Sequence, residues 1–327
     1  MTDVTDAVIT ATDICKSFDD EDAVLDGVDL TVRDGETLVL MGPNGAGKSV
    51  LLSCLAGGDR PDSGRVDILG SPATDRDDTT SFLLQDALAH EKLTGRENIA
   101  FYERLHPNFT EWSEYVDRLD LDGDALAKTV EDYSGGMVRK LELAIAASID
   151  APIYLFDEPT AALDLTAIGT VHELFREKRD AGKTLVVASH RPMDADVADR
   201  IAFLADGRIV ETGTPEDLLA SVPPVLETGV TNATALAEAV AGEPYAVAGS
   251  VRGFLPRARE RSGSDFVAVI ARETGIDPAD LSTVEPTYTD LFNYYTNGTS
   301  TTSANSEPDG PAVDTATTTT ACGTDAR

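Results

Sequence analysis

Short apolar runs alternate with helix-like stretches over the first two thirds of the chain. Strands are predicted at residues 37–41, 153–156 and 184–188, where β-branched residues and leucines follow one another almost without polar interruption. Runs of this length fit buried strands, and helical patterning between them is typical of βαβ units that build a mainly parallel sheet. Residues 1–220 are therefore predicted to form one α/β domain.

The strand pattern stops between residues 86 and 133. Apolar residues recur there with helical spacing, around positions 98–105 and 112–119. A helical lobe inserted into the α/β domain is the simplest interpretation of this change in period.

The chain changes character again after residues 222–224, a Val-Pro-Pro sequence that is typical of a linker. Residues 225–295 regain mixed apolar periodicity and are predicted to form a small α+β accessory region. Residues 296–327 are dominated by Thr, Ser, Ala, Gly and Pro. Such a segment buries too little apolar surface to offset the entropy of ordering, so we expect a disordered tail.

The charge balance is strongly acidic. The 327 residues include 26 Lys and Arg against 58 Asp and Glu, a net charge of −32. A surface this negative repels the phosphates of nucleic acids, so a nucleic-acid partner is not expected. An acidic, lysine-poor surface is typical of a protein adapted to high salt, where the self-repulsion is screened.

The N-terminal segment and the length of the apolar runs indicate where in the cell the protein is expected. Asp3 and Asp6 lie where a signal peptide needs positive charge, and no apolar segment follows them. No stretch approaches 18 consecutive apolar residues. We therefore expect a cytoplasmic protein, which needs another chain to supply any membrane span.

A glycine-rich sequence, G-P-N-G-A-G-K-S, follows the predicted strand at 37–41 and fits the phosphate-binding pattern G-x-x-x-x-G-K-S. Its glycines let backbone N–H groups turn inward around phosphate oxygens, and the helix that follows adds its positive dipole end. Lys48 is expected to reach the β- and γ-phosphates, and the Ser49 hydroxyl to ligate Mg²⁺. A chance glycine-rich turn is the competing interpretation. The residues predicted to contact the nucleotide are Gly42, Pro43, Asn44, Gly45, Ala46, Gly47, Lys48, Ser49 and Val50.

Two adjacent carboxylates, Asp157 and Glu158, follow the predicted strand at 153–156. Asp157 is expected to hold Mg²⁺, and Glu158 to orient and deprotonate an attacking water molecule. Acidic residues at the start of a loop are common, so this interpretation depends on the phosphate-binding pattern.

A third motif consists of Ser134, Gly135 and Gly136 ahead of an amphipathic stretch. This start predicts a second helix N-terminus able to bind an anion. In isolation an ordinary capped helix start is the better interpretation.

Together, in this order, the motifs resemble those of the ATPase subunits of ATP-binding-cassette (ABC) proteins. The resemblance covers about residues 5–220. It implies a P-loop NTPase fold of the α/β class, with a mainly parallel sheet, an N-terminal antiparallel β part and a helical subdomain inserted at 86–133. It also implies ATP and Mg²⁺ as ligands and ATP hydrolysis as the activity.

The resemblance assigns roles to single residues elsewhere in the chain. Gln85 matches a glutamine implied in catalysis and metal binding, and His190 matches a histidine that senses the γ-phosphate. Phe18 lies where an aromatic ring stacks on adenine, and Asp164 lies in the D-loop. Taken singly, Gln85 fits a surface glutamine, His190 a loop histidine and Phe18 a core aromatic.

The implied mechanism is dimeric, since the family sandwiches ATP between one subunit's phosphate loop and the other's signature motif. Ser134, Gly135 and Gly136 match that signature and would meet the partner's nucleotide. We therefore expect a homodimer, or a pair with a similar ATPase subunit. The helical lobe after Gln85 would transmit its motion to an integral membrane permease, which places the protein at the inner face of the membrane.

Three positions depart from the usual pattern. Tyr133 and Met137 replace the common Leu and Gln of the signature, and this variant resembles exporter-like ABC subunits with separate membrane subunits. Val50 replaces a hydroxyl residue that commonly contacts the α-phosphate. The loss of one such hydrogen bond weakens nucleotide binding by about 1 kcal/mol.

Two other functions compete with that of a transport ATPase. One is an ABC ATPase without a permease, of the iron–sulfur-assembly or translation-factor type; the single cassette and the acidic surface argue against a translation factor. The other is a nucleotide-binding regulator that does not turn over, which the presence of Glu158 and His190 disfavours. The transported substrate is not encoded in these motifs.

Overall fold

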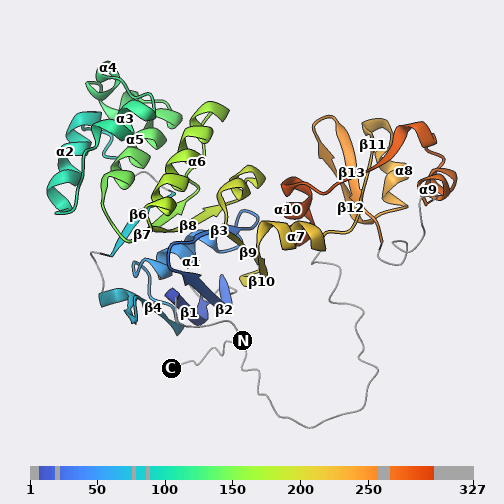
Figure 1. The fold of residues 1–327 in the computed structure, drawn as a ribbon, viewed down its shortest axis with the longest axis horizontal. Helices are drawn as coiled ribbons and strands as arrows, with labels where there is room; N and C mark the ends of the chain where they lie inside the picture. Colours follow the sequence, from blue (N-terminus) through green and yellow to red (C-terminus); the bar gives the residue numbers. More distant parts are fainter. Residues whose placement is uncertain (1–6, 19–22, 76–78, 86–88, 257–265, 298–327) are drawn as a thin grey trace, which may run out of the picture. The chain divides into compact units, whose positions relative to one another are not determined.

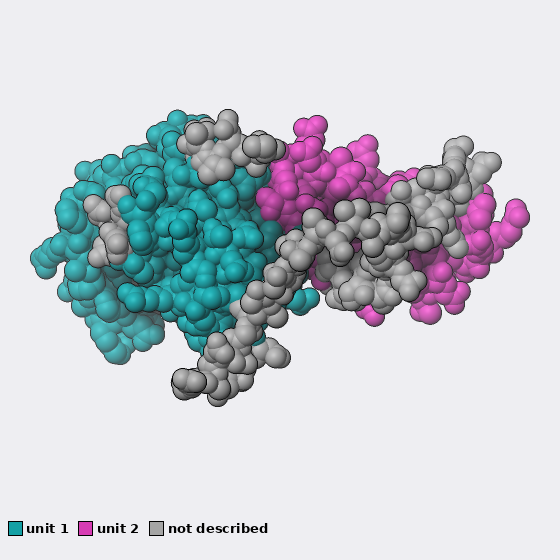
Figure 2. Space-filling view, turned by 90° about the horizontal axis from the view of Figure 1, so that it is seen from below, with its two compact units in different colours: residues 1–210 teal, residues 211–327 magenta. Residues whose placement is uncertain are grey.

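The structure is a computed structural model that describes residues 7–18, 23–75, 79–85, 89–256 and 266–297. The chain divides into two compact units, residues 1–210 and 211–327 (Figure 2). The boundary expected at 220–225 and the helical subdomain expected at 86–133 stay predictions. The expected disordered tail lies almost entirely outside the described residues, which end at 297.

A six-stranded sheet in the order β10-β9-β3-β8-β7-β6 forms the centre of the first unit (Figure 1). Its strands are β3 (Thr37–Met41), β6 (Thr80–Leu83), β7 (Ile153–Asp157), β8 (Thr184–Ser189), β9 (Arg200–Ala205) and β10 (Arg208–Gly213). Every residue of β3, β7 and β8 is buried, which explains why these strands appear in the sequence as unbroken apolar runs. The three strands predicted from those runs are confirmed.

The parallel register brings distant parts of the chain to one edge of this sheet. Met41 pairs with Ser189, Asp157 with Ala188, and Leu83 with Phe156. Because parallel strands share the edge at which they end, the segments that follow β3, β6, β7 and β8 emerge together there.

An antiparallel sheet in the order β2-β1-β4-β5 completes the β structure of this unit. Its strands are β1 (Ala7–Lys16), β2 (Leu25–Arg33), β4 (Ser63–Ile68) and β5 (Ser71–Pro72). One hydrophobic core joins both sheets and the helix α1 (Lys48–Leu55), with fully buried residues such as Ile9, Leu51 and Leu155. The expected antiparallel N-terminal part is therefore confirmed.

Helices dominate between the strands β6 and β7. They are α2 (Gly95–Leu105), α3 (Ser113–Arg118), α4 (Gly123–Leu126) and α5 (Gly135–Ser148), with a 3₁₀ turn η3 (Val130–Asp132). In Figure 1, α2, α3 and α4 gather at one end of the unit and β1, β2 and β4 lie at the other. Thr94 begins α2 with a capping box, in which its hydroxyl accepts the Glu97 N–H and the Glu97 carboxylate accepts the Thr94 N–H. The helix-like patterns at 98–105 and 112–119 thus correspond to α2 and α3.

A long helix, α6 (Leu165–Asp180), connects β7 to β8, and short 3₁₀ turns lie at η2 (Ala73–Asp75) and η4 (Pro192–Val197). Phe175 on α6 stacks on Phe156 of β7, with ring centroids 4.7 Å apart. Phe175 belongs to the buried face of α6, which also includes Ile168 and Val171 and packs against the sheet.

The second unit has a four-stranded antiparallel sheet in the order β12-β13-β11-β14. Its elements are α7 (Pro215–Ser221), β11 (Val225–Gly229), η5 (Val230–Asn232), α8 (Ala233–Ala237), β12 (Ala241–Val247), β13 (Ser250–Phe254), α9 (Phe266–Thr274), η7 (Pro278–Asp280), β14 (Leu281–Val284) and α10 (Tyr288–Asn297). Asp290 of α10 is fully buried and accepts hydrogen bonds from Tyr245 and Arg252 of the sheet. Among the described residues of the whole chain, no helix has both the length and the apolar character needed to cross a membrane.

Candidate functional site

A cavity of ≈ 360 Å³ lies at the edge where the parallel strands end. It collects side chains from segments that are widely separated in sequence. The residues that line it are Val24, Asn44, Gly45, Gly47, Lys48, Ser49, Val50, Gln85, Glu158 and His190. Nine of these ten were predicted from the sequence, so the parallel register brings half of the 18 predicted site residues to one place.

The glycine-rich loop depends on the absence of side chains at two positions. Gly47 has φ +99°, and a Cβ there would lie 2.8 Å from the Val24 carbonyl oxygen. At Gly42 a Cβ would lie 2.1 Å from the Leu204 carbonyl oxygen. Both residues therefore let the loop pack tightly against neighbouring backbone.

Lys48 is buried at the base of the loop, with only 6% of its surface exposed. Its ammonium group donates to the Gly42 and Pro43 carbonyls at 2.9 and 3.0 Å and lies 3.7 Å from Glu158 Oε1. Burial lowers the Lys48 pKa, an effect that the carboxylates of Glu158 and Asp157 oppose. The Lys48 ammonium group thus lies near the carboxylates of Glu158, which lines the cavity, and Asp157, which does not.

Ser49, Gln85 and Asp157 offer oxygen atoms of the kind that Mg²⁺ prefers. The Ser49 hydroxyl donates to Gln85 Oε1 at 3.3 Å. Burial raises the Asp157 pKa, an effect that the neighbouring Ser49 hydroxyl opposes. Asp157 Oδ1 is buried without a hydrogen-bond partner among the described residues. An orphaned buried carboxylate oxygen beside a hydroxyl and an amide oxygen fits a hard divalent cation.

Glu158 and His190 both line the cavity, and their side chains are in contact. His190 Nδ1 lies 2.8 Å from Glu158 Oε2, without the alignment of a hydrogen bond. Glu158 has φ +50°, an unfavourable conformation for a residue with a side chain. Its N–H donates to the Ala188 carbonyl at 2.9 Å, so the backbone turns sharply at the end of β7.

A buried carboxylate, Asp194, connects the loops that carry these two residues. It accepts hydrogen bonds from Thr160 at 2.7 Å and from Ser189, and it lies 2.8 Å from His172 Nε2 on α6. Asp194 is 1% exposed. Thr160 follows Glu158 by two positions and Ser189 precedes His190, so this network fixes both loops relative to α6.

The other predicted residues lie outside this cavity lining. Ser134 begins α5 and accepts the Met137 N–H at 3.3 Å, while Asp164 begins α6 and accepts the Ala167 N–H at 2.8 Å. Gly135 and Gly136 lie beside Ala162, where a Cβ on Gly136 would approach the Ala162 carbonyl oxygen to 2.9 Å. Phe18 is exposed, with Lys16 Nζ 5.2 Å from its ring centroid.

Gly42, Pro43 and Ala46 belong to the glycine-rich loop and do not appear in the lining. One described lining residue, Val24, was not foreseen, because its contact with Gly47 joins segments 23 positions apart. Tyr133, which replaces the common Leu of the signature, has a structural role. The Tyr133 hydroxyl donates to the Ala125 carbonyl of α4 at 2.7 Å.

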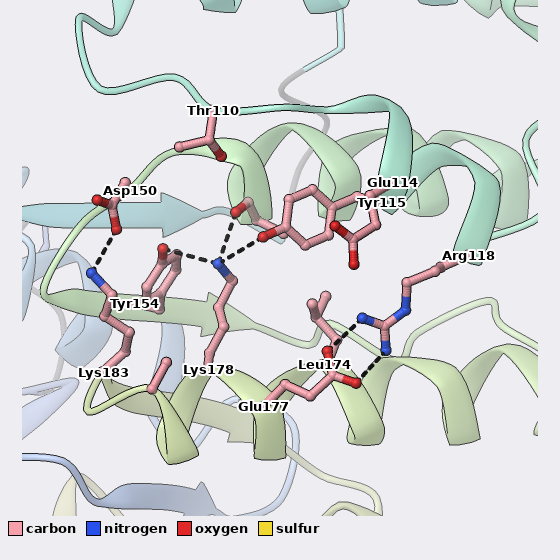
Figure 3. Close-up of a pocket in the computed structure, with 12 residues that line it drawn as sticks. Thr110, Glu114, Tyr115, Arg118, Asp150, Tyr154, Leu174, Glu177, Lys178 and Lys183 are labelled. Carbon is pink, nitrogen blue, oxygen red and sulfur yellow. Dashed lines mark hydrogen bonds and ion pairs between the residues drawn. The ribbon is translucent and has the colours of Figure 1, made fainter.

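A second cavity, of ≈ 260 Å³, lies in the first unit beside α3 and α6 (Figure 3). Lys178 of α6 points between Tyr115 and Tyr154, and its ammonium group donates to the Tyr154 hydroxyl at 3.0 Å and the Ala147 carbonyl at 2.8 Å. Burial lowers the pKa of Lys178 to about 8. Lys178 also donates to the Tyr115 hydroxyl at 3.4 Å, and its bond to Ala147 links the last turn of α5 to α6.

Comparison with known proteins identifies the family. A family model described as "ABC transporter" matches residues 25–161. The daunorubicin resistance ATP-binding protein DrrA3 of Streptomyces coeruleorubidus is 31% identical over 306 residues, which are 89% of this chain and 96% of the relative. The hemin import ATP-binding protein HmuV of Streptomyces coelicolor is 37% identical over 211 residues, 60% of this chain and 75% of the relative.

A solved dimeric structure, the ATP-binding cassette MJ0796 in a post-hydrolysis state with ADP and Pi, is similar at a TM-score of 0.58 and 26% identity, covering 63% of this chain and 98% of that one. The chain belongs to the family of ABC transporter ATP-binding subunits. It is an ATP-binding and ATP-hydrolysing protein of the P-loop class, as the fold and the glycine-rich loop indicate.

Proposed function

We propose that this chain is the ATPase subunit of an ABC exporter, acting as a dimer on a separate membrane permease. The observation that carries the proposal is the cavity at the edge of the parallel sheet, which joins the phosphate loop with Gln85, Glu158 and His190. A lysine, a buried carboxylate and a histidine that line one cavity suit phosphoryl transfer to water.

The glycine-rich loop and Lys48 would hold the phosphates of ATP. Loop N–H groups and the N-terminus of α1 provide positive potential, and the Lys48 ammonium group adds a charge of its own. Mg²⁺, held by Ser49, Asp157 and Gln85, would neutralise charge on the phosphate oxygens. Phe18 is proposed to stack on adenine, and Val50 to contact the nucleotide without a hydroxyl.

Glu158 would act as the general base on the attacking water. Its carboxylate lies beside Lys48 and His190, so both orientation and charge are set by the loops around it. His190 would bind the γ-phosphate, and Gln85 would orient water near the Ser49 hydroxyl.

The signature residues support a dimer. Ser134 and Gly135 are exposed at the start of α5 and lie outside the cavity lining, so they are available to a second subunit. Leu165, next to Asp164, is 74% exposed, so an apolar side chain beside Asp164 is also available to a second subunit. We infer that Ser134, Gly135, Gly136 and Asp164 contact the nucleotide of the partner.

Exposed apolar side chains on the helical part support a permease partner. Leu84 lies beside Gln85, and Phe101 and Leu105 lie on α2; all three are exposed. Export is favoured by the Y-S-G-G-M signature and by the relative that matches 89% of the chain, a drug-resistance ATP-binding protein, whereas the import relative matches 60%. The ABC ATPase without a permease is not favoured, because the relatives are named as transport and resistance subunits.

ATP turnover in molar KCl with Mg²⁺ tests the proposed roles. Glu158→Gln is expected to lower kcat at least about 100-fold while nucleotide binding persists, and Lys48→Ala to weaken nucleotide binding itself. Removal of Mg²⁺ with EDTA is expected to abolish turnover. Glu173→Gln serves as the matched control, because it is also a Glu-to-Gln substitution and Glu173 is exposed on α6. Turnover by Glu158→Gln at the wild-type rate would show that Glu158 is not the base.

A further inference from the structure

Arg139 is a buried arginine in the middle of α5, with 5% of its surface exposed. Its guanidinium group donates to three backbone carbonyls on two different segments. Nη1 donates to the Leu84 carbonyl at 2.9 Å, and Nη2 donates to the Glu158 carbonyl at 2.8 Å and to the Asp157 carbonyl. The Arg139 side chain therefore contacts the residue before Gln85 and the backbone of Asp157 and Glu158.

A second buried residue on the same helix completes this arrangement. Glu142 lies one turn from Arg139 and pairs with Nη1 at 3.2 Å, and it is 2% exposed. Its other carboxylate oxygen, Oε1, accepts the Ala89 N–H at 3.3 Å. Because a buried ion pair is costly to desolvate, its presence in an otherwise apolar helix face calls for a role beyond packing.

The backbone that Arg139 contacts is strained. Glu158 has φ +50°, and a residue with a side chain stays in such a conformation only where its surroundings fix it. The Glu158 N–H is held by Ala188 and the Glu158 carbonyl by Arg139, so both peptide groups that flank this residue are fixed. Without Arg139 the Glu158 carbonyl keeps the Ala161 N–H as a donor, at 3.0 Å within the same loop, but loses its hydrogen bond to α5.

We propose that Arg139 is a positioning residue, which sets Glu158 and Gln85 relative to α5. The inference rests on the proposed function for the roles of those two residues. Since α5 begins at Gly135, the same helix that presents the signature to the partner's nucleotide also holds the base of its own site. A shift of α5 on closure of the dimer would thus reach Glu158 through one guanidinium group.

Two variants test the proposal in the full-length protein. Arg139→Lys keeps the positive charge beside Glu142 but cannot reach carbonyls on both segments. Arg139→Met with Glu142→Met removes the pair without leaving a buried charge, so that folding is preserved. Arg118→Lys is the matched control. Arg118 also forms a bidentate ion pair, with Glu177, and does not contact the loops of the phosphate-site cavity.

Hydrogen exchange followed by mass spectrometry is the first measurement, since it needs no turnover. Peptides covering residues 80–85 and 155–163 are expected to exchange at least about threefold faster in both Arg139 variants than in the Arg118→Lys control. In steady-state assays, kcat is expected to fall about 10- to 100-fold with the KM for ATP within about threefold of wild type, because the phosphate loop is unchanged.

Two results would overturn the inference. One is exchange in these peptides at the rate of the Arg118→Lys control. The other is wild-type kcat in an Arg139 variant under conditions where Glu158→Gln is inactive. If Glu158→Gln itself turns over normally, the proposed function fails, while the exchange rates still decide whether Arg139 holds the two loops.

Discussion

Replacement of Lys178 by glutamine removes a buried charge from the wall of the cavity in Figure 3. The Lys178 ammonium group lies 4.4 Å from the centroid of the Tyr154 ring and donates to the Ala147 carbonyl at the end of α5. Glutamine keeps a donor for these acceptors but does not titrate. Wild type and Lys178→Gln therefore differ mainly in how the free energy of unfolding depends on pH.

The size of the effect follows from the pKa of about 8 for Lys178, against an ordinary value of 10.5. Between these values the folded protein has released the proton and the unfolded chain still binds it, so the free energy of unfolding rises with pH. Below about pH 8 the cost of burying the charge is present in full; it disappears as pH approaches 10.5. Relative to Lys178→Gln, wild type is expected to gain about 2 kcal/mol between pH 8 and pH 10.

Urea unfolding at fixed high salt, followed by the fluorescence of the single tryptophan, measures this difference. Trp112 lies at the start of α3, in the same unit as Lys178, so it reports on the unfolding of that unit. Lys128→Gln is the control, because Lys128 is exposed in the same unit and is not among the charges that shift the Lys178 pKa. If wild type and Lys178→Gln keep a constant difference from pH 8 to pH 10, the buried ammonium group does not titrate as described.

Three further changes have expected outcomes that stability or binding measurements can check. Asp194→Ala removes the acceptor shared by Thr160, Ser189 and His172 and should cost about 3–5 kcal/mol by urea unfolding; a loss below about 1 kcal/mol would contradict the buried network. Tyr133→Phe removes one hydrogen bond and should cost about 1 kcal/mol, whereas no change in the urea midpoint would make the hydroxyl irrelevant. Gly47→Ala should weaken binding of a fluorescent ATP analogue at least about tenfold, because φ +99° and the Val24 carbonyl leave no room for Cβ, and unchanged affinity would refute this.

The parts of the fold that the sequence predicts are those governed by local patterns. Buried parallel strands are apolar on both faces, so β3, β7 and β8 stand out as uninterrupted runs. The glycine-rich loop is equally visible, since its conformation requires glycine at fixed positions. Parallel pairing then brings the loops together, which is why the glycine-rich loop, Gln85, Glu158 and His190 line a single cavity.

The parts that the sequence does not predict depend on contacts between distant segments. Arg139 and Asp194 look like ordinary polar residues in their local sequence, and their partners lie up to 55 positions away. The hydroxyl of Tyr133 finds its acceptor in α4, which no periodicity indicates. Buried polar groups of this kind gain their meaning only from the packed structure, because their hydrogen-bond partners are fixed by tertiary contacts.

The proposed ATP-closed dimer is tested most directly by the molar mass of Glu158→Gln, measured by size exclusion with light scattering in molar KCl and Mg²⁺. The variant should bind ATP without hydrolysing it, so the pair that ATP closes should persist. The proposed mechanism predicts a monomer without nucleotide and a dimer with ATP, with Ser134→Arg abolishing the dimer because the signature faces the partner's phosphates. A monomer at saturating ATP, or a dimer that forms equally well without it, would contradict that mechanism.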